Sequence, residues 1–220
     1  MAGSRTKNRE SRAERARATR AKVVDAAVGL FVGTGYLQTT MADIARTAGV
    51  SVQTLYLSFG GKGAVLSAAM DVTIAGDDEP VPIVERAWHQ EMREEPDGRR
   101  AYGHFLAASS TIIQRFYPLY AAIRAAAADP EVADLLDRNK RERFTTFRAV
   151  VEELSGKQGY AEGLAVDRAA EMVYTQQSEE TYGLLVVERG WPAGDWSTWV
   201  EHHVAAELFP VVVRDLGQSS

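Results

Sequence analysis

Residues 51–62, SVQTLYLSFGGK, combine small polar side chains with one Tyr, two adjacent Gly and a Lys. On a helix surface these types could contact a nucleic acid. Gln53 can pair bidentately with adenine, and Val52 can contact the methyl group of thymine. Tyr56 and Lys62 suit phosphate groups. A helix that enters the roughly 12 Å wide major groove must lack bulky exposed side chains near its N-terminus, and residues 51–54 meet that requirement.

Two short helices are predicted to position these residues. Thr40 followed by Asp43 is a capping-box-like start, Gly49 can end a helix in the left-handed conformation, and Ser51 is a good N-cap for the next helix. Two helices joined by such a turn form a helix-turn-helix. The predicted DNA-contacting residues are Thr40, Ser51, Val52, Gln53, Thr54, Tyr56, Leu57, Ser58 and Lys62. The alternative is a small helical pair that contacts another protein.

Charge is distributed unevenly along the chain. The net charge is −5, yet residues 1–62 hold ten Lys and Arg against four Asp and Glu. Opposite signs in the two parts suggest that only the first part meets a polyanion such as double-stranded DNA. A basic tail that is merely solvated remains the alternative, as does direct contact of this arm with a minor groove.

The same region resembles a known family. The patterns F-x-x-x-G-Y, T-T-M-A-D-I-A-x-x-A-G-V-S and T-L-Y-x-x-F-x-x-K, read from Phe31 to Lys62, are similar to the DNA-binding signature of TetR-type transcriptional regulators. The resemblance implies an all-α homodimer of about nine helices per subunit, with three N-terminal helices that bind DNA and a larger helical ligand-binding and dimerisation domain. Gly61 and Gly63 depart from the family pattern, which leaves the start of the fourth helix open.

The remaining chain is also predicted to be helical. We expect a flexible basic arm over residues 1–19, the DNA-binding domain over 20–66 and the ligand-binding and dimerisation domain over 67–220. Breaks are expected at 76–82 and 94–98. A long helix over 99–128 is expected to kink at Pro118, and Asp129 and Pro130 should start another. Residues 166–189 and 195–213 should form the last two helices.

Aromatic residues with interspersed polar residues in the middle of the chain suggest a pocket for an unknown small hydrophobic or amphipathic effector. The predicted lining residues are Trp88, Phe105, Ser109, Phe116, Tyr120, Phe147, Tyr174 and Gln177. The alternative is an ordinary hydrophobic core.

Apolar stripes on the last two predicted helices suggest a four-helix bundle between two subunits. The predicted dimerisation residues are Thr181, Leu184, Leu185, Trp196, Val200, His203, Val204 and Leu208. Packing within the subunit is the alternative. The adjacent His202 and His203 point about 100° apart on a helix and cannot chelate one ion alone, so we expect no metal site and no cofactor.

Several function classes are not favoured. The chain has no Cys, and no stretch approaches the roughly 18 apolar residues of a membrane-spanning helix. We therefore expect a soluble cytoplasmic protein. Motifs of hydrolases, zinc proteases and nucleotide-binding enzymes are missing, so we expect no enzymatic activity.

These observations predict a DNA-binding transcriptional regulator, a repressor that a ligand releases from a near-palindromic operator. The alternative is an all-α homodimeric module that binds a ligand or a protein and whose helix-turn-helix does not bind DNA. The sequence does not distinguish repression from activation.

Overall fold

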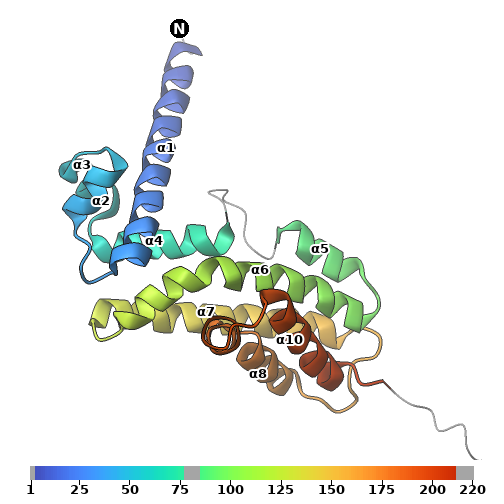
Figure 1. Ribbon diagram of the computed structural model, residues 1–220. Helices are drawn as coiled ribbons and strands as arrows, with labels where there is room; N and C mark the ends of the chain where they lie inside the picture. The colour runs from blue at the N-terminus through green and yellow to red at the C-terminus, as the bar shows by residue number, and fades with distance from the viewer. Residues whose placement is uncertain (1–2, 77–84, 212–220) are drawn as a thin grey trace, which may run out of the picture. The chain divides into compact units, whose positions relative to one another are not determined.

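A computed structural model describes residues 3–76 and 85–211, and within these ranges the side chains from residue 14 onward. The predicted all-α fold is confirmed (Figure 1). The helices are α1 (Gly3–Thr34), α2 (Met41–Ala48), α3 (Val52–Phe59), α4 (Lys62–Ala75), α5 (Ala87–Glu94), α6 (Gly98–Ala125), α7 (Pro130–Ser155), α8 (Val166–Gln176), α9 (Glu179–Tyr182), the π-helix η2 (Gly183–Glu188) and α10 (Ala193–Leu208).

The helices belong to two compact units. One comprises Met1–Pro80 with Arg115–Arg138, and the other comprises Val81–Gln114 with Asn139–Ser220. The long helices α6 and α7 therefore each contribute one part to each unit. This grouping differs from a division between residues 66 and 67, because α4 and parts of α6 and α7 share a core with the first three helices.

The first unit is built around one buried cluster. Val23, Ala27 and Phe31 recur at helical spacing on α1 and are almost fully buried, as are Ile44 of α2 and Leu55 of α3. Burial of the Val, Phe, Ile and Leu side chains among them contributes about 1.5–3 kcal/mol each. Because α2 and α3 are each only eight residues long, they depend on this packing for their stability.

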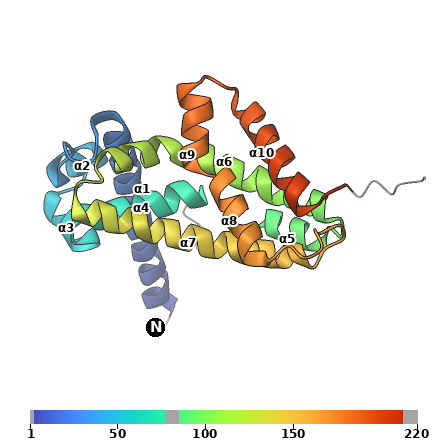
Figure 2. The ribbon, with the colours of Figure 1, turned by 90° about the horizontal axis from the view of Figure 1, so that it is seen from below.

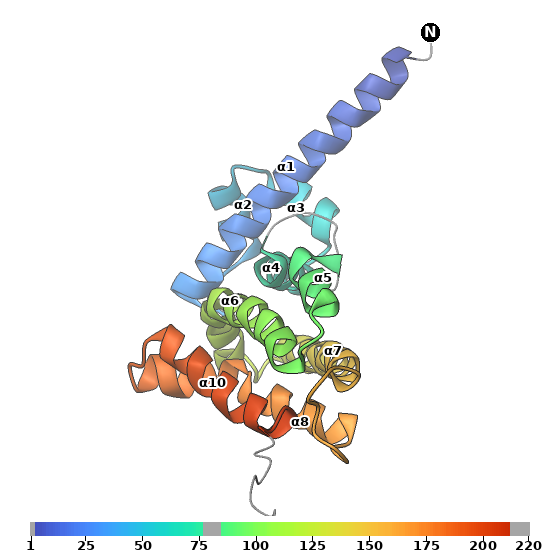
Figure 3. The ribbon, with the colours of Figure 1, turned by 90° about the vertical axis from the view of Figure 1, so that its right-hand side faces the viewer.

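The expectation of a flexible arm over residues 1–19 is wrong for residues 3–19, which are helical and continue into the packed part of α1. Figures 1 and 3 show this half of α1 extending beyond α2 and α3. The physical reason is composition: from Ser4 to Val28 the sequence contains neither Gly nor Pro and is rich in Ala, Arg, Lys and Glu, which favour helices.

The second unit has its own buried cluster, formed by parts of α5, α6, α7, α8 and α10. Pro118 lies inside α6, which is a single helical element, and Asp129 caps α7 as predicted, its Oδ1 accepting from the backbone N–H of Glu131 at 2.9 Å. The break expected at 76–82 falls largely outside the described residues.

The last two helices differ from the prediction. Residues 166–189 are not one helix, because α8 ends at Gln176 and Ser178 takes an extended backbone conformation as the N-cap of α9, accepting from the N–H of Thr181 (Figure 2). The final helix ends at Leu208, since Pro210 follows within two residues and disfavours a helical residue before it. Residues 212 and 213 lie outside the described range.

Candidate nucleic-acid interface

The predicted capping box at the start of α2 is present. The Thr40 Oγ1 accepts from the Asp43 N–H at 3.1 Å, and the Asp43 carboxylate accepts from the Thr40 N–H, also at 3.1 Å. The hydrogen bond from the Thr40 hydroxyl, followed by that from Arg46, lowers the pKa of Asp43. Thr40 is exposed at a helix N-terminus, a position that suits contact with a phosphate.

The turn between α2 and α3 is as tight as predicted. Gly49 adopts φ of 69°, which places it in the left-handed region, and its N–H and that of Val50 bond to carbonyls of the last turn of α2. Ser51 then caps α3 by accepting from the Thr54 N–H at 3.0 Å, while the two hydroxyls share a hydrogen bond of 2.7 Å. The direction of α3 is therefore determined within three residues of the end of α2.

The helix α3 buries one side and exposes the other. Leu55 is fully buried and Phe59 packs partly against the same core, whereas Tyr56 is 51% exposed and Leu57 is 82% exposed. The exposed residues of this segment are Ser51, Val52, Gln53, Thr54, Tyr56, Leu57 and Ser58, as predicted. Small and polar side chains dominate the first turn, so the backbone there can approach a groove closely.

The structure shows Lys62 in hydrogen bonds within its own unit, while its phosphate contact stays a prediction. Its Nζ donates to the carbonyl oxygens of Tyr36 and Thr39 at 3.0 and 3.2 Å and lies 4.1 Å from the centroid of the Tyr36 ring. Lys62 therefore fastens the segment that leads into Thr40. Lys62 is the first residue of α4, and its side chain extends from there to the connection between α1 and α2.

Tyr36 is the second part of this arrangement. Its ring is buried and tilts against that of Phe31 at a centroid distance of 5.3 Å. Burial, followed by the charges of Glu131 and Asp129 and a hydrogen bond to Glu131, raises the pKa of Tyr36 to about 12. The sequence did not reveal the role of Glu131, because no local pattern links this residue to Tyr36, about 95 positions earlier in the chain.

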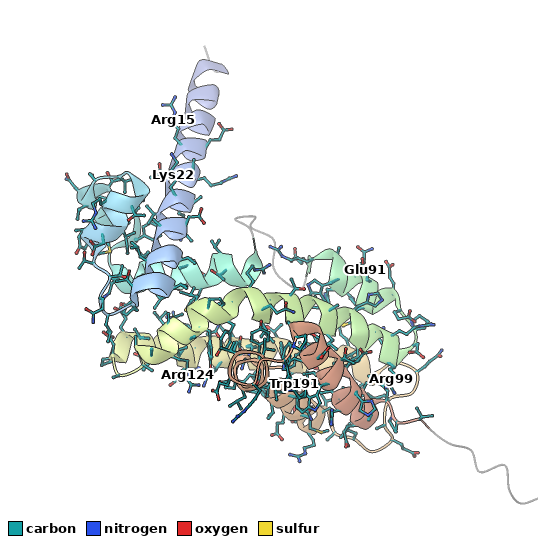
Figure 4. All side chains as sticks on the ribbon, viewed as in Figure 1. Arg15, Lys22, Glu91, Arg99, Arg124 and Trp191 are labelled. Carbon is teal, nitrogen blue, oxygen red and sulfur yellow. The ribbon has the colours of Figure 1, made fainter. Side chains whose placement is uncertain are left out.

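Basic residues on α1 lie in the same unit as α3. Arg15, Arg17 and Lys22 are exposed, and Figure 4 labels Arg15 and Lys22 on the part of α1 that runs past the helix-turn-helix. Arg20 stacks on Phe59 at the end of α3, with its guanidinium carbon 4.6 Å from the ring centroid. As a helix about 10–12 Å across, the described part of the arm is too thick for the roughly 6 Å minor groove.

The predicted pocket residues divide between the two units. Phe116 and Tyr120 belong to the core of the first unit, so they do not line a site in the second. The other six belong to the second unit, where the rings of Trp88 and Phe105, Phe105 and Phe147, and Phe147 and Tyr174 lie 5.8, 5.0 and 6.3 Å apart. Gln177 is fully buried and donates to the Ser109 hydroxyl. The regular spacing of apolar residues along a helix does not show which of the two hydrophobic cores each residue joins.

Four of the eight predicted dimerisation residues are buried within the subunit, so the expectation that these four face a partner is wrong. Trp196, Val200, Val204 and Leu208 are 0% exposed and pack in the second core, where the Trp196 indole donates to Thr181 at 3.2 Å. A stripe that packs within a subunit and one that packs between subunits have the same sequence pattern.

The other predicted residues and two unpredicted ones lie nearer the surface. Leu184 and His203 are exposed and Leu185 is partly buried. Val187 and Trp191 are also exposed and lie on or just after η2, and Figure 4 labels Trp191 in the connection between η2 and α10. With Leu184 they are three exposed large apolar side chains within eight residues, and two of them were not predicted from the sequence.

No group of three or more His, Asp or Glu side chains is arranged to hold a metal ion in the part of the chain that the structure describes. No helix within 3–76 and 85–211 is long and apolar enough to cross a membrane.

Comparisons with known proteins agree with this geometry. A family model described as bacterial regulatory proteins, tetR family, matches residues 23–69. The HTH-type transcriptional regulator TtgW of Pseudomonas putida, itself uncharacterised, is 36% identical over 83 residues, which are 34% of this chain and 59% of that protein. The match thus spans less than two thirds of this relative.

Solved structures extend the likeness in fold. A TetR-family regulator from Rhodococcus sp. superimposes with a TM-score of 0.68 at 16% identity, covering 86% of this chain and 98% of that one. The regulator FadR from Bacillus subtilis, solved in complex with stearoyl-CoA, gives 0.63 at 18% identity with the same coverage. Residues 23–69 therefore match the tetR family model, and the chain shares its fold over most of its length with solved regulators of that family.

Proposed function

We propose that this protein is a DNA-binding transcriptional regulator that reads a major groove through α3. The observation that carries the proposal is the exposure of α3: a helix fixed by buried Leu55 and by the turn at Gly49 presents nearly all its other side chains to the surroundings. A short polar helix held in this way is the recognition element of helix-turn-helix proteins. The basic surface of α1 supplies charge for the phosphate backbone.

The proposal includes a homodimer, because two symmetric recognition helices match two half-sites of a near-palindromic operator. The subunit surface that supports pairing is formed by Leu184, Val187 and Trp191, which are 53%, 56% and 37% exposed. Three large apolar side chains within eight residues are a typical feature of an interaction site.

The regulator acts as a repressor that a hydrophobic or amphipathic small molecule releases. Support comes from the row of aromatic rings in the second unit and from buried polar groups beside it: among the described residues, Trp88 Nε1 and Ser110 Oγ have no hydrogen-bond partner. Buried polar groups are normally satisfied, so a ligand or water is expected there. A relative of the same fold was solved with stearoyl-CoA, an amphipathic molecule. A preference of about 3 kcal/mol for the released conformation would lower DNA affinity roughly a hundredfold.

The first test is fluorescence anisotropy with DNA from beside the protein's own gene, across a series of salt concentrations. Wild type is compared with Tyr56→Ala, which removes an exposed ring of α3, and with Tyr117→Ala as a partly buried control outside α3. We expect salt-dependent binding that only Tyr56→Ala weakens. Binding without salt dependence, or to no fragment of the genome, would instead favour an all-α module whose helix-turn-helix contacts a protein.

The effector is sought with the same assay. Long-chain acyl-CoA and aromatic amphiphiles are added to the protein–DNA complex, and a compound is accepted when it binds the free protein and lowers DNA affinity. Phe105→Ala removes a ring at the centre of the aromatic row and should weaken the effect of such a compound. The proposal assigns no catalytic step to the chain and places it in the cytoplasm with its DNA. A compound that binds tightly without changing DNA affinity would contradict the release mechanism.

A further inference from the structure

The most exposed large apolar side chain of α3 lies in the second half of the helix. Leu57 is 82% exposed, more than Tyr56 at 51% or Val52 at 40% in the same helix. Its neighbours in the helical direction are polar or small, so Leu57 packs against no cluster of apolar residues. Exposing a whole leucine to water costs free energy that burial against a partner recovers. This position therefore favours an apolar contact that is made only when the helix is docked.

Helix geometry places Leu57 beside Gln53. Successive residues of an α-helix turn by about 100°, so residues 53 and 57 each lie within about 20° of the direction opposite to buried Leu55. Gln53 and Leu57 together form the outermost ridge of α3. They are four residues apart, which is about 6 Å along the axis, or nearly two base-pair steps of roughly 3.4 Å.

The chemistry of this ridge matches one kind of base pair. Gln can donate to N7 and accept from N6 of adenine in the major groove, and the C5 methyl group of thymine is the apolar group that this groove offers. Guanine and cytosine present no methyl group there. A ridge of one amide and one leucine, without Arg or Lys, is therefore poorly suited to guanine, whose usual partners are those two side chains.

We propose that Leu57 is a specificity-determining residue that contacts a thymine methyl group, about two base pairs from an adenine that Gln53 reads. This inference rests on the proposed function, and it adds the base class that each half-site must contain. Tyr56 lies beside the ridge and is left to sugar and phosphate contacts.

The test begins with duplexes selected by the wild-type protein from a random DNA library. Each thymine of the selected half-site is then replaced by deoxyuridine, which removes only the methyl group. We expect one position where this replacement weakens wild-type binding roughly fourfold per half-site, the effect of removing one buried methyl group. Leu57→Ala should bind both duplexes equally, and Gln53→Ala should lose its preference for adenine about two base pairs away.

Leu37→Ala serves as the matched control, because Leu37 is another exposed leucine of the first unit but lies outside α3. It should respond to deoxyuridine as the wild type does. If Leu57→Ala retains the full response at every thymine, the inference is wrong although the protein still binds DNA. If the wild type selects no DNA at all, the proposed function itself fails, so the two failures are distinguishable.

Discussion

The carboxylate of Glu131 lies against the backbone of Gly63, in the space that a Cβ atom at this position would need. The same carboxylate is a hydrogen-bond partner of the Tyr36 phenol. One side chain at the start of α7 thus meets both the first turn of α4 and the segment between α1 and α2. The glycine that departs from the family pattern is explained by this contact, and a negative charge beside the first turn of α4 also suits the helix dipole.

The other end of α4 is held in a complementary way. The Arg115 guanidinium donates from Nε to the carbonyl of Thr73 at 2.6 Å and from an η nitrogen to that of Ile74 at 2.7 Å. A positive charge beside the last carbonyls of a helix is favourable. The helix that follows the recognition helix is therefore held by an acid from α7 at its start and a base from α6 at its end.

Ionisation of Tyr36 should make the protein lose stability at alkaline pH. Its folded pKa of about 12 lies above the usual value of 10, so the stabilisation is complete below pH 10 and is lost as the pH rises toward 12. The free energy of unfolding should fall by roughly 2 kcal/mol over this range. Urea unfolding at several pH values, with Tyr36→Phe as the control that lacks the ionising group, measures this loss. Equal losses in both proteins would contradict the assignment.

Glu131→Gln removes the charge that meets Tyr36 while keeping the shape of the side chain. We expect the pKa of Tyr36 to fall but to remain above 10, since burial is its largest cause. Asp129→Asn should produce a smaller change, because that carboxylate acts through its charge alone. The tyrosine resonances in a pH titration by NMR, assigned with Tyr36→Phe, provide the readout. An unchanged pKa in Glu131→Gln would rule out the contact.

Removing the Arg115 guanidinium should destabilise the first unit. Arg115→Ala loses two charge-assisted hydrogen bonds to the end of α4, and because the side chain is exposed we expect a loss of about 1–2 kcal/mol. Arg124→Ala is a matched control on the same helix, where the guanidinium donates to the Tyr120 hydroxyl at 3.1 Å. Its unfolding free energy should change less. Chemical denaturation compares the two, and equal effects would show that Arg115 does not hold α4.

Substitution of Lys62 tests whether its hydrogen bonds within the subunit stabilise the protein in the absence of DNA. Lys62→Met keeps the apolar stem but loses both carbonyl contacts, so the protein without DNA should lose about 1–3 kcal/mol of stability. Lys22→Met, at an exposed position of α1, should change stability by less than about 0.5 kcal/mol. Thermal unfolding of both variants and the wild type without DNA measures these changes in stability. A Lys62→Met protein as stable as the wild type would contradict the stabilising role of these two hydrogen bonds.

The sequence predicted the helix-turn-helix well because its signals are local. The capping box of Thr40, the left-handed Gly49 and the N-cap Ser51 each act within a few residues, and all three are present. The flexible arm was mispredicted for the opposite reason: absence of an apolar stripe was taken as absence of helix, although Ala- and Arg-rich sequences favour helix without one.

Long-range features could not be predicted in this way. The apolar stripe of Trp196 and Val200 was assigned to an interface between subunits, because periodicity does not distinguish such an interface from the core of one subunit. Phe116 was assigned to the pocket for a similar reason, since α6 changes its packing partners along its length. The contact of Glu131 with Gly63 joins positions far apart in the chain, and no local pattern encodes it.

Two substitutions in the second unit distinguish effects on dimerisation from effects on the stability of the subunit. Leu184→Glu places a charge on the apolar surface after α9 and should shift the protein from dimer to monomer in sedimentation velocity, with little change in helix content. Trp196→Phe should lose about 1–3 kcal/mol of stability yet still pair, because the indole is fully buried and donates to Thr181. Leu37→Glu controls for an added charge elsewhere. If Leu184→Glu sediments like the wild type, pairing uses another surface.

The basic half of α1 should strengthen DNA binding without reading sequence. Arg15 and Arg17 are exposed on a helix too thick for the minor groove, so we expect them to meet phosphates. The double variant Arg15→Ala with Arg17→Ala should lower the slope of log affinity against log salt by about 2. It should weaken selected and random DNA equally. Arg141→Ala with Arg168→Ala removes two exposed arginines of the second unit and should leave the slope unchanged. A loss confined to the selected sequence would instead show that α1 reads bases.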